Sequence, residues 1–283
     1  MADSQPVVFL GMPNYDGNVN MFAAMSFATG ASKGKCKVFR SQSKSSLLPD
    51  AFNSLWVDCL NQRGKHGFTH FAMLHSDIAP EDGWVDTLVS ELERTGADLI
   101  SAVSPIKDTR GVTSTAIDDQ RDPWTVLRRL TLKEVYNLPE TFGAAEAGWI
   151  GHRLLVNTGC WVCRLDRPWV EQCDTVFFEI KTRIIRENGG FTRQVIPEDW
   201  AFSRAVQDAG GRVLATRLVR LHHYGFHAYS NASPWGHWNE DEKRAELEPR
   251  LAKIRSNGKA VGGAGLGQKA EATKAHASVA IPV

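Results

Sequence analysis

Short apolar runs alternate with longer amphipathic stretches over roughly the first hundred residues. The runs that predict strands are residues 6–12, 35–41, 68–74 and 97–105. The stretches with helical spacing are residues 18–31, 48–62 and 83–96, the last of which ends in a glycine. Strands and helices that alternate at this pitch are typical of βαβ units, so we expect an α/β protein with a mostly parallel central sheet.

The pattern becomes less regular after residue 106. Residues 107–151 are rich in charge, threonine and glycine, which predicts an insertion or a loop-rich region on the acceptor side of a site. Apolar strands return within residues 153–165. A helix is predicted over residues 197–211, because carboxylates occupy its first turn and a glycine pair ends it. Further strands are expected over residues 212–216 and 218–225.

The last part of the sequence has a different composition. From residue 256 small residues dominate and large apolar ones nearly vanish, so we expect residues 256–283 to be a disordered tail. Its GGAGLGQK segment does not meet the phosphate-loop pattern, because Gln268 stands where that pattern requires glycine. We therefore expect one domain, residues 1–255, with a nucleotide-binding part over about 1–105 and an acceptor-side part over about 106–255.

Composition and charge narrow the class of protein. The 283 residues include 42% hydrophobic residues and carry a net charge of +1, which argues against a dedicated nucleic-acid binder. A local basic patch, VLRRLTLK, remains possible at residues 126–133. The sequence shows no signal peptide and no apolar run long enough to span a bilayer. Five cysteines without a leader fit reduced thiols, so we expect a cytoplasmic protein.

Two of these cysteines form a Cys-x-x-Cys pair. If Cys160 and Cys163 lie on a strand, residues three apart face opposite sides and cannot share a metal ion. We therefore expect them to be packing residues.

The segment FTHFAMLHSD ends an apolar strand in polar residues. Ligands of parallel sheets bind beyond the carboxyl ends of the strands, where Asp77 is expected to lie. A carboxylate there suits Mg²⁺ or Mn²⁺, which prefer oxygen ligands and bridge to a diphosphate. The alternative is that Asp77 or Asp82 only caps the following helix.

A second segment, IPEDWAFSRAVQDAGGRVLATRLVRLHHYG, decides between these interpretations. An acidic pair opens a helix, a glycine pair ends it, a strand follows, and a His-x-Gly comes last. Together with the strand that ends in Asp77, this order resembles the GT-A nucleotide-sugar glycosyltransferases, particularly glycosyltransferase family 2, over residues 7–225. The resemblance implies a Rossmann-like GT-A fold, a three-layer α/β/α sandwich. It also implies a metal-dependent, inverting enzyme that moves a sugar from a nucleoside-diphosphate sugar to an acceptor hydroxyl.

The same resemblance implies roles for individual residues. Asp77 would bind Mn²⁺ or Mg²⁺, and His75 replaces the first acid of the Asp-x-Asp-like motif. His75 would either ligate the metal or only form a local hydrogen bond. Asp199, after Glu198, would be the general base, and the same two acids complement the helix dipole. His223 would complete the metal shell.

Other histidines and loops compete for or extend this site. His222 and His227 are rivals of His223, but strand alternation allows only one of His222 and His223 to face the metal. The donor nucleotide would contact residues at the ends of the first and third strands. These residues are Pro13, Asn14, Tyr15, Asp16, His75 and Ser76. Trp235 would belong either to a lid over the diphosphate or to a segment packed statically on the sheet.

Three alternatives remain open on the sequence. The chain could be a catalytically silent nucleotide-sugar or carbohydrate-binding protein, or a retaining glycosyltransferase. A sugar nucleotidyltransferase is less favoured, because the loop after the first strand lacks the glycine-rich, basic signature that holds a triphosphate. The acceptor could be a glycan, a lipid-linked intermediate, a protein or a modified DNA base.

Overall fold

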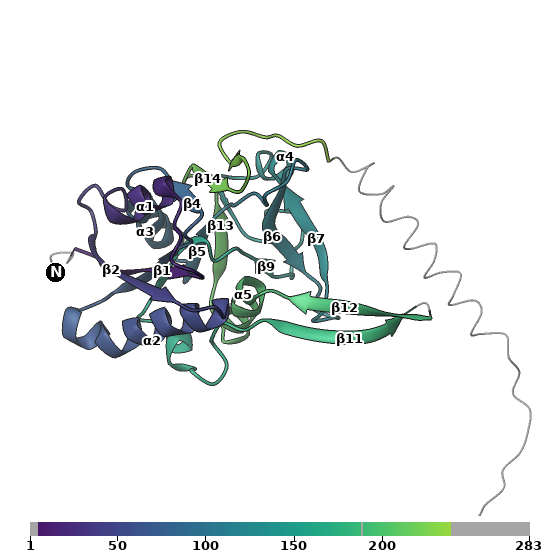
Figure 1. The fold of residues 1–283 in the computed structure, drawn as a ribbon, viewed down its shortest axis with the longest axis horizontal. Helices are drawn as coiled ribbons and strands as arrows, with labels where there is room; N and C mark the ends of the chain where they lie inside the picture. Colours follow the sequence, from purple (N-terminus) through teal and green to yellow (C-terminus); the bar gives the residue numbers. More distant parts are fainter. Residues whose placement is uncertain (1–4, 188, 239–283) are drawn as a thin grey trace, which may run out of the picture. The chain divides into compact units, whose positions relative to one another are not determined.

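The computed structural model describes residues 5–187 and 189–238. Its centre is a seven-stranded sheet. The strand order is β2 (Lys37–Lys44), β1 (Val7–Asn14), β3 (His70–Leu74), β10 (Cys160–Arg164), β5 (Leu99–Ala102), β13 (Val213–Thr216) and β8 (Thr141–Phe142). β2, β1 and β3 are parallel, as are β5 and β13, whereas β10 is antiparallel to β3 and β5 and β8 is antiparallel to β13. The sheet is therefore mostly parallel, as predicted (Figure 1).

Helices pack on both faces of this sheet. On one face, α2 (Leu48–His66) and α5 (Glu198–Asp208) join a core cluster with Phe71 and Trp161. On the other face, α1 (Met21–Ala28) and α3 (Trp84–Thr95) pack against Ala72 and Val162. Both faces of the central strands are apolar because neither meets solvent. The predicted alternation of strands and helices over the first hundred residues is confirmed, with β1, β2 and β3 parallel.

The antiparallel strand β10 explains the Cys-x-x-Cys pair. Cys163 belongs to the cluster that contains α2 and α5, and Cys160 to the cluster that contains α1 and α3. The two thiols thus lie on opposite faces of the sheet, as the strand interpretation predicts. All five cysteines are free, and only Cys173 is exposed.

The predicted loop-rich region after residue 106 is more regular than its composition indicates. β6 (Val112–Asp118) pairs with β7 (Val126–Thr131) and with β9 (Leu154–Leu155) to form a second sheet. The short helix α4 (Leu132–Val135) follows β7 and begins with a capping box between Thr131 and Glu134. The composition misled because three consecutive hydroxyl residues, Thr113, Ser114 and Thr115, lie inside β6 with their side chains buried between elements.

Two further pairings lie around the sheet edge that bears Asp77. β14 (Leu221–Tyr224) pairs with β4 (Ile78–Pro80) and with β15 (Ala228–Ser230). Elsewhere in the fold, a short 3₁₀ turn, η1 (Pro168–Glu171), follows β10. β14 is shorter than the predicted strand over residues 218–225. Its register places His223 opposite Ile78.

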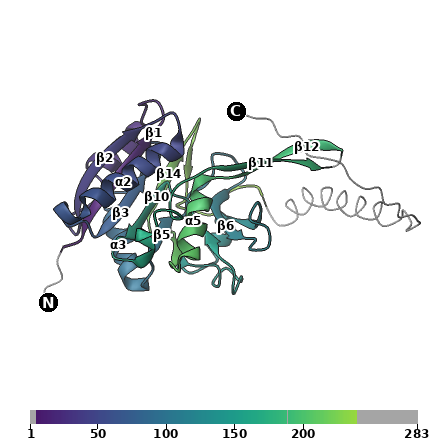
Figure 2. The ribbon, with the colours of Figure 1, turned by 90° about the horizontal axis from the view of Figure 1, so that it is seen from below.

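A long hairpin was absent from the prediction. β11 (Lys181–Glu187) and β12 (Gly190–Ile196) pair with each other and with no other strand of the described chain. The hairpin extends away from the central sheet in both views (Figures 1 and 2). Two runs rich in β-branched and aromatic residues, separated by glycines at 189 and 190, were the available sequence signal. The predicted domain end at residue 255 and the predicted tail lie outside the described residues.

Candidate active site

The carboxyl ends of β1, β3 and β5 meet at one edge of the central sheet, since these strands run the same way. Asp77 follows β3 and Lys107 follows β5. The loop after β1 reaches the same edge, because the Asn20 backbone N–H donates a hydrogen bond of 2.8 Å to the Ser76 carbonyl. The topology thus collects side chains from distant parts of the sequence, as parallel sheets do.

Asp77 lies between two cationic or potentially cationic side chains. Its Oδ2 is 2.6 Å from the Lys107 ammonium and 3.4 Å from His223 Nε2. His223 Nδ1 lies 2.8 Å from the Pro105 carbonyl, which can only accept a hydrogen bond. Nδ1 therefore carries a hydrogen, and Nε2 is the ring nitrogen that faces Asp77.

These contacts keep the Asp77 carboxylate ionised. Burial by itself raises the pKa of Asp77, but the side-chain contacts with His223 and Lys107 outweigh it, so the pKa falls below the ordinary value. Burial lowers the pKa of His75 to about 4, so this imidazole is neutral at physiological pH. Its Nε2 is shielded from solvent without a hydrogen-bond partner, and its ring packs on Phe52 with centroids 5.0 Å apart.

The structure brings one of the three candidate histidines to Asp77. His223 faces it, whereas His222 points from the opposite side of β14 into a groove that Tyr224 and Phe22 also line. His227 is exposed in the turn that follows β14. Strand alternation accounts for the difference between the two adjacent histidines.

Asp199 is a buried carboxylate in the first turn of α5, with 8% of its surface exposed. Its Oδ1 accepts a hydrogen bond from the Trp200 backbone N–H at 2.8 Å, and its Oδ2 accepts one from Asn157 Nδ2 at 3.3 Å. Burial, reinforced by the neighbouring Glu198, raises the pKa of Asp199 to about 7, although Trp200, Arg129 and Asn157 act in the opposite direction. Burial also raises the pKa of Glu198.

One short segment connects Asp199 to the strand that bears Asp77. Asn157 Oδ1 accepts a hydrogen bond from the Gly159 N–H at 2.6 Å, and the Gly159 carbonyl accepts one from the His75 N–H at 2.8 Å. A β-carbon at residue 159 would overlap Ile78 and crowd Asn157 and His75. Glycine is thus required here for close packing of the two halves of the site.

The loop after β1 is held mainly by its own side chains. Asn14 Oδ1 accepts hydrogen bonds from the N–H groups of Asp16 and Gly17, at 3.1 and 2.6 Å. Hydrogen bonds from Asn18 lower the pKa of the exposed Asp16. Asn14 and Asp16 therefore shape the loop, while Tyr15 is 62% exposed and Pro13 is buried in β1. Of the four predicted nucleotide contacts at residues 13–16, Tyr15 has the side chain best placed to stack on a ligand.

Trp235 belongs to a segment packed against the second sheet. Its indole N–H donates to the Ser230 carbonyl, and its side chain packs on the main core cluster. A β-carbon on Gly111 would overlap the backbone of Trp235 and Gly236. These contacts favour the static alternative over the predicted lid.

Lys107 and Arg129 are residues of the candidate site without a predicted role, whereas Asn157 begins the segment 157–163 that the glycosyltransferase resemblance places along the donor-sugar and acceptor pocket. Lys107 stands in the Pro-x-Lys sequence directly after β5, and Arg129 in the basic patch noted at residues 126–133. The Arg129 guanidinium lies 4.5 Å from the centroid of the Trp200 ring, near Asp199. Only the fold shows that Lys107 and Arg129 belong to the site, because each is distant in sequence from both aspartates.

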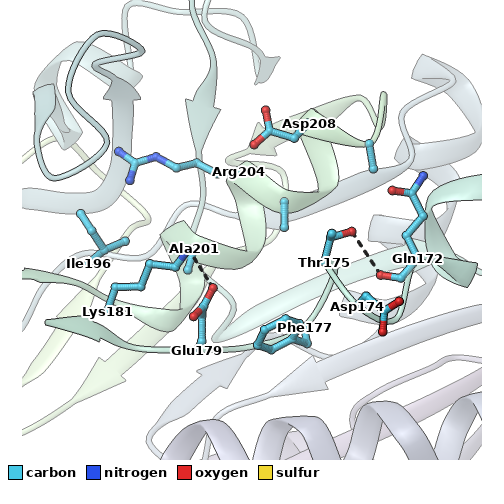
Figure 3. A pocket seen from close by; sticks show the side chains of 12 residues that line it. Gln172, Asp174, Thr175, Phe177, Glu179, Lys181, Ile196, Ala201, Arg204 and Asp208 are labelled. Atoms are coloured by element: carbon cyan, nitrogen blue, oxygen red, sulfur yellow. Dashed lines mark hydrogen bonds and ion pairs between the residues drawn. The ribbon is translucent and has the colours of Figure 1, made fainter. Parts of the chain in front are cut away.

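A separate hollow of about 510 Å³ lies on the outer side of α5 (Figure 3). Ala201, Arg204 and Asp208 line it from the helix face opposite Asp199. Both of its basic side chains are paired: Lys181 with Glu179 at 2.9 Å, and Arg204 with Asp118. The hollow is therefore not part of the candidate site, because it lies on the face of α5 that points away from Asp199.

The described residues contain no group of three or more His, Cys, Asp or Glu side chains that could hold a metal ion by themselves. Asp77 and His223 nevertheless fit as two ligands, because neighbouring ligands of an octahedral Mg²⁺ stand about 3 Å apart. A metal ion here would therefore need further oxygens from a ligand such as a diphosphate, and Lys107 would have to release Asp77.

Comparisons with known proteins leave the family open. No protein-family model matches the sequence, and no curated protein matches it. Among solved structures, the chain is similar to the "Crystal Structure of A197 from STIV", with 12% identity over 82% of this chain and 95% of that chain and a TM-score of 0.46. A similarity this distant says nothing about activity. Within residues 5–187 and 189–238, no helix has the length and apolar content needed to cross a membrane.

Proposed function

We propose that this protein is a glycosyltransferase that moves a sugar from a nucleoside-diphosphate sugar to an acceptor hydroxyl, with Asp199 as general base. The observation that carries the proposal is a buried carboxylate whose pKa is raised to about 7, connected through Asn157 and Gly159 to the strand end that bears Asp77. Perturbed carboxylates that converge with cationic groups at a sheet edge are typical of catalytic sites.

The architecture supports a GT-A arrangement. A mostly parallel sheet with helices on both faces would form the donor half, and the second, smaller sheet would form the acceptor half. The loop after β1 and Ser76 would meet the nucleotide, with Tyr15 exposed for stacking. β6 and β7 would border the acceptor.

Asp199 suits the base role because its raised pKa lies near physiological pH. An ionised Asp199 would accept the proton of the acceptor hydroxyl as that oxygen attacks the anomeric carbon and the nucleoside diphosphate leaves. Burial makes the ionised form a stronger base than an exposed aspartate. Since the base form is present above its pKa, the transfer rate should rise with pH through about 7.

Positive charge would stabilise the leaving diphosphate. Asp77 and His223 would hold a divalent cation, and Lys107 would turn from Asp77 to a phosphate oxygen. When bound, Mn²⁺ or Mg²⁺ would neutralise charge that develops on the leaving group. His75 would stay a neutral neighbour of Asp77, since its pKa is lowered.

A catalytically silent nucleotide-sugar-binding protein is the second candidate. The observation that favours it is the Lys107–Asp77 ion pair of 2.6 Å, which already compensates the carboxylate that would bind a metal ion. A retaining transferase would keep the same metal-binding residues but require no base at Asp199.

The decisive experiment is a screen of nucleotide sugars for Mn²⁺-dependent release of nucleoside diphosphate, with and without candidate acceptors. Wild type, Asp199→Asn and the control Asp208→Asn are compared, because Asp208 lies on the same helix but is 61% exposed. Release that Asp199→Asn abolishes and Asp208→Asn preserves supports the inverting transferase. Donor binding without release in any combination would favour the silent protein.

A further inference from the structure

The hairpin β11–β12 has one face that no part of the described chain covers. Its register puts Thr182, Ile184 and Arg186 on the same side as their pairing residues Val195, Arg193 and Phe191. All six residues are exposed, and the apolar ones strongly so: Ile184 is 74% exposed, Phe191 75% and Val195 39%. Large apolar side chains gathered on one projecting face mark an interaction surface.

The opposite face of the hairpin holds it in place. Arg183 donates a hydrogen bond of 2.6 Å to Gln194, and its guanidinium lies 4.5 Å from the centroid of the Trp124 ring. Ile196, at the root of the hairpin, is buried beside Trp200 and Ala201. The free face therefore points outward because the other face packs on the body of the protein.

The charge on the free face identifies the chemistry of its ligand. Arg186 and Arg193 are interspersed among the three apolar side chains, and the Arg186 guanidinium lies 5.1 Å from the centroid of the Phe191 ring. Across both strands there are four basic residues and one acidic residue, a net charge of +3 in a chain whose total is +1. The ligand should thus be apolar beneath and negatively charged at its surface.

We propose that this face of the hairpin binds the surface of a lipid bilayer that contains anionic lipids. Ile184, Phe191 and Val195 enter the boundary between headgroups and acyl chains, and Arg186 and Arg193 contact anionic headgroups. The aliphatic stems of the arginines allow their charges to stay at the interface while the neighbouring side chains are buried. A convex, projecting hairpin meets a bilayer without needing a complementary groove.

Two other ligands fit these side chains less well. A second copy that packed face to face through a two-fold axis would bring the arginines of both copies together, and like charges at an interface are unfavourable. A single-stranded nucleic acid would gain stacking on Phe191 alone, because Ile184 and Val195 offer no aromatic surface. Only a hydrocarbon layer beneath anionic groups uses all five side chains.

The test is co-sedimentation of the full 283-residue chain with vesicles of phosphatidylcholine alone and of phosphatidylcholine with added phosphatidylserine. We expect preferential binding to the anionic vesicles. Arg186→Gln with Arg193→Gln should lower that binding by about thirtyfold, and Ile184→Ser with Phe191→Ser by at least about tenfold. Because the altered side chains are exposed, thermal unfolding of these variants should match wild type.

A matched control changes Ile150 and Leu47 to serine, since these side chains are 85% and 67% exposed but lie outside the hairpin. The control should bind vesicles like wild type. Equal binding to both kinds of vesicle, or none, would overturn the proposal. Two other results would also overturn the proposal: self-association in sedimentation velocity, or oligonucleotide binding that is tighter than vesicle binding. Either result counts when the Ile184→Ser, Phe191→Ser variant no longer shows it, because the hairpin face is then the binding surface for that other ligand. The readout is binding, so the result does not depend on the proposed glycosyl transfer.

Discussion

Replacing Asp199 by asparagine should change the pH dependence of stability as well as catalysis. The pKa of Asp199 is about 7 in the folded protein against an ordinary value of 3.8. The folded state thus holds this proton more tightly than the unfolded chain. The resulting stabilisation is fully present below about pH 4 and is lost as pH rises through about 7.

The magnitude follows from the shift. A difference of about three pKa units corresponds to roughly 4 kcal/mol of stability lost by wild type between pH 4 and pH 8. Asparagine does not titrate and keeps an acceptor for the Trp200 N–H, but its amide no longer accepts from Asn157, which costs about 1 kcal/mol. The variant should therefore be about 1 kcal/mol less stable than wild type near pH 4 and roughly 3 kcal/mol more stable near pH 8.

Urea denaturation at both pH values measures this difference directly. Asp208→Asn is the control, because that exposed carboxylate should change stability by less than about 0.5 kcal/mol at either pH. A difference between Asp199→Asn and wild type that is the same at both pH values would refute the burial argument. In the transfer assay, the same variant should bind donor and turn over roughly two to four orders of magnitude more slowly.

Three further predictions concern the other side of the site. Asp77→Ala should abolish Mn²⁺-stimulated binding of a nucleoside diphosphate in calorimetry; unchanged metal-dependent affinity would exclude Asp77 as a ligand. Lys107→Gln removes the ammonium 2.6 Å from Asp77, so Mn²⁺ alone should bind more tightly by about three- to tenfold. A titration followed by electron paramagnetic resonance measures this affinity, and weaker binding would contradict competition between Lys107 and the metal ion for Asp77. Gly159→Ala should cost about 1–3 kcal/mol in thermal unfolding, because its β-carbon would overlap Ile78; a fully stable variant would show that the segment can move.

Much of the fold is determined by local sequence pattern. The apolar runs of β1, β3 and β5 and the amphipathic helices between them required only periodicity and caps to predict. The end of α3 at Gly96, with φ +65°, is one example. The opposite faces of Cys160 and Cys163 followed from strand alternation alone. Local pattern misled at two places. In β6, polar side chains are buried between elements. In the hairpin β11–β12, the strands pair only with each other within the described chain, so one of their faces carries no core pattern.

The candidate site combines both kinds of information. Asp77, Asp199 and His223 were identifiable because each stands at a recognisable strand end, helix start or His-x-Gly. Their surroundings come from the tertiary structure: Lys107 reaches Asp77 across 30 positions, and Asn157 reaches Asp199 across 42. The pKa of Asp199 likewise depends on burial, which no local pattern contains. Residue types and their spacing thus determined which side chains were candidates for a site, and long-range packing decided which of them meet and in what state of charge.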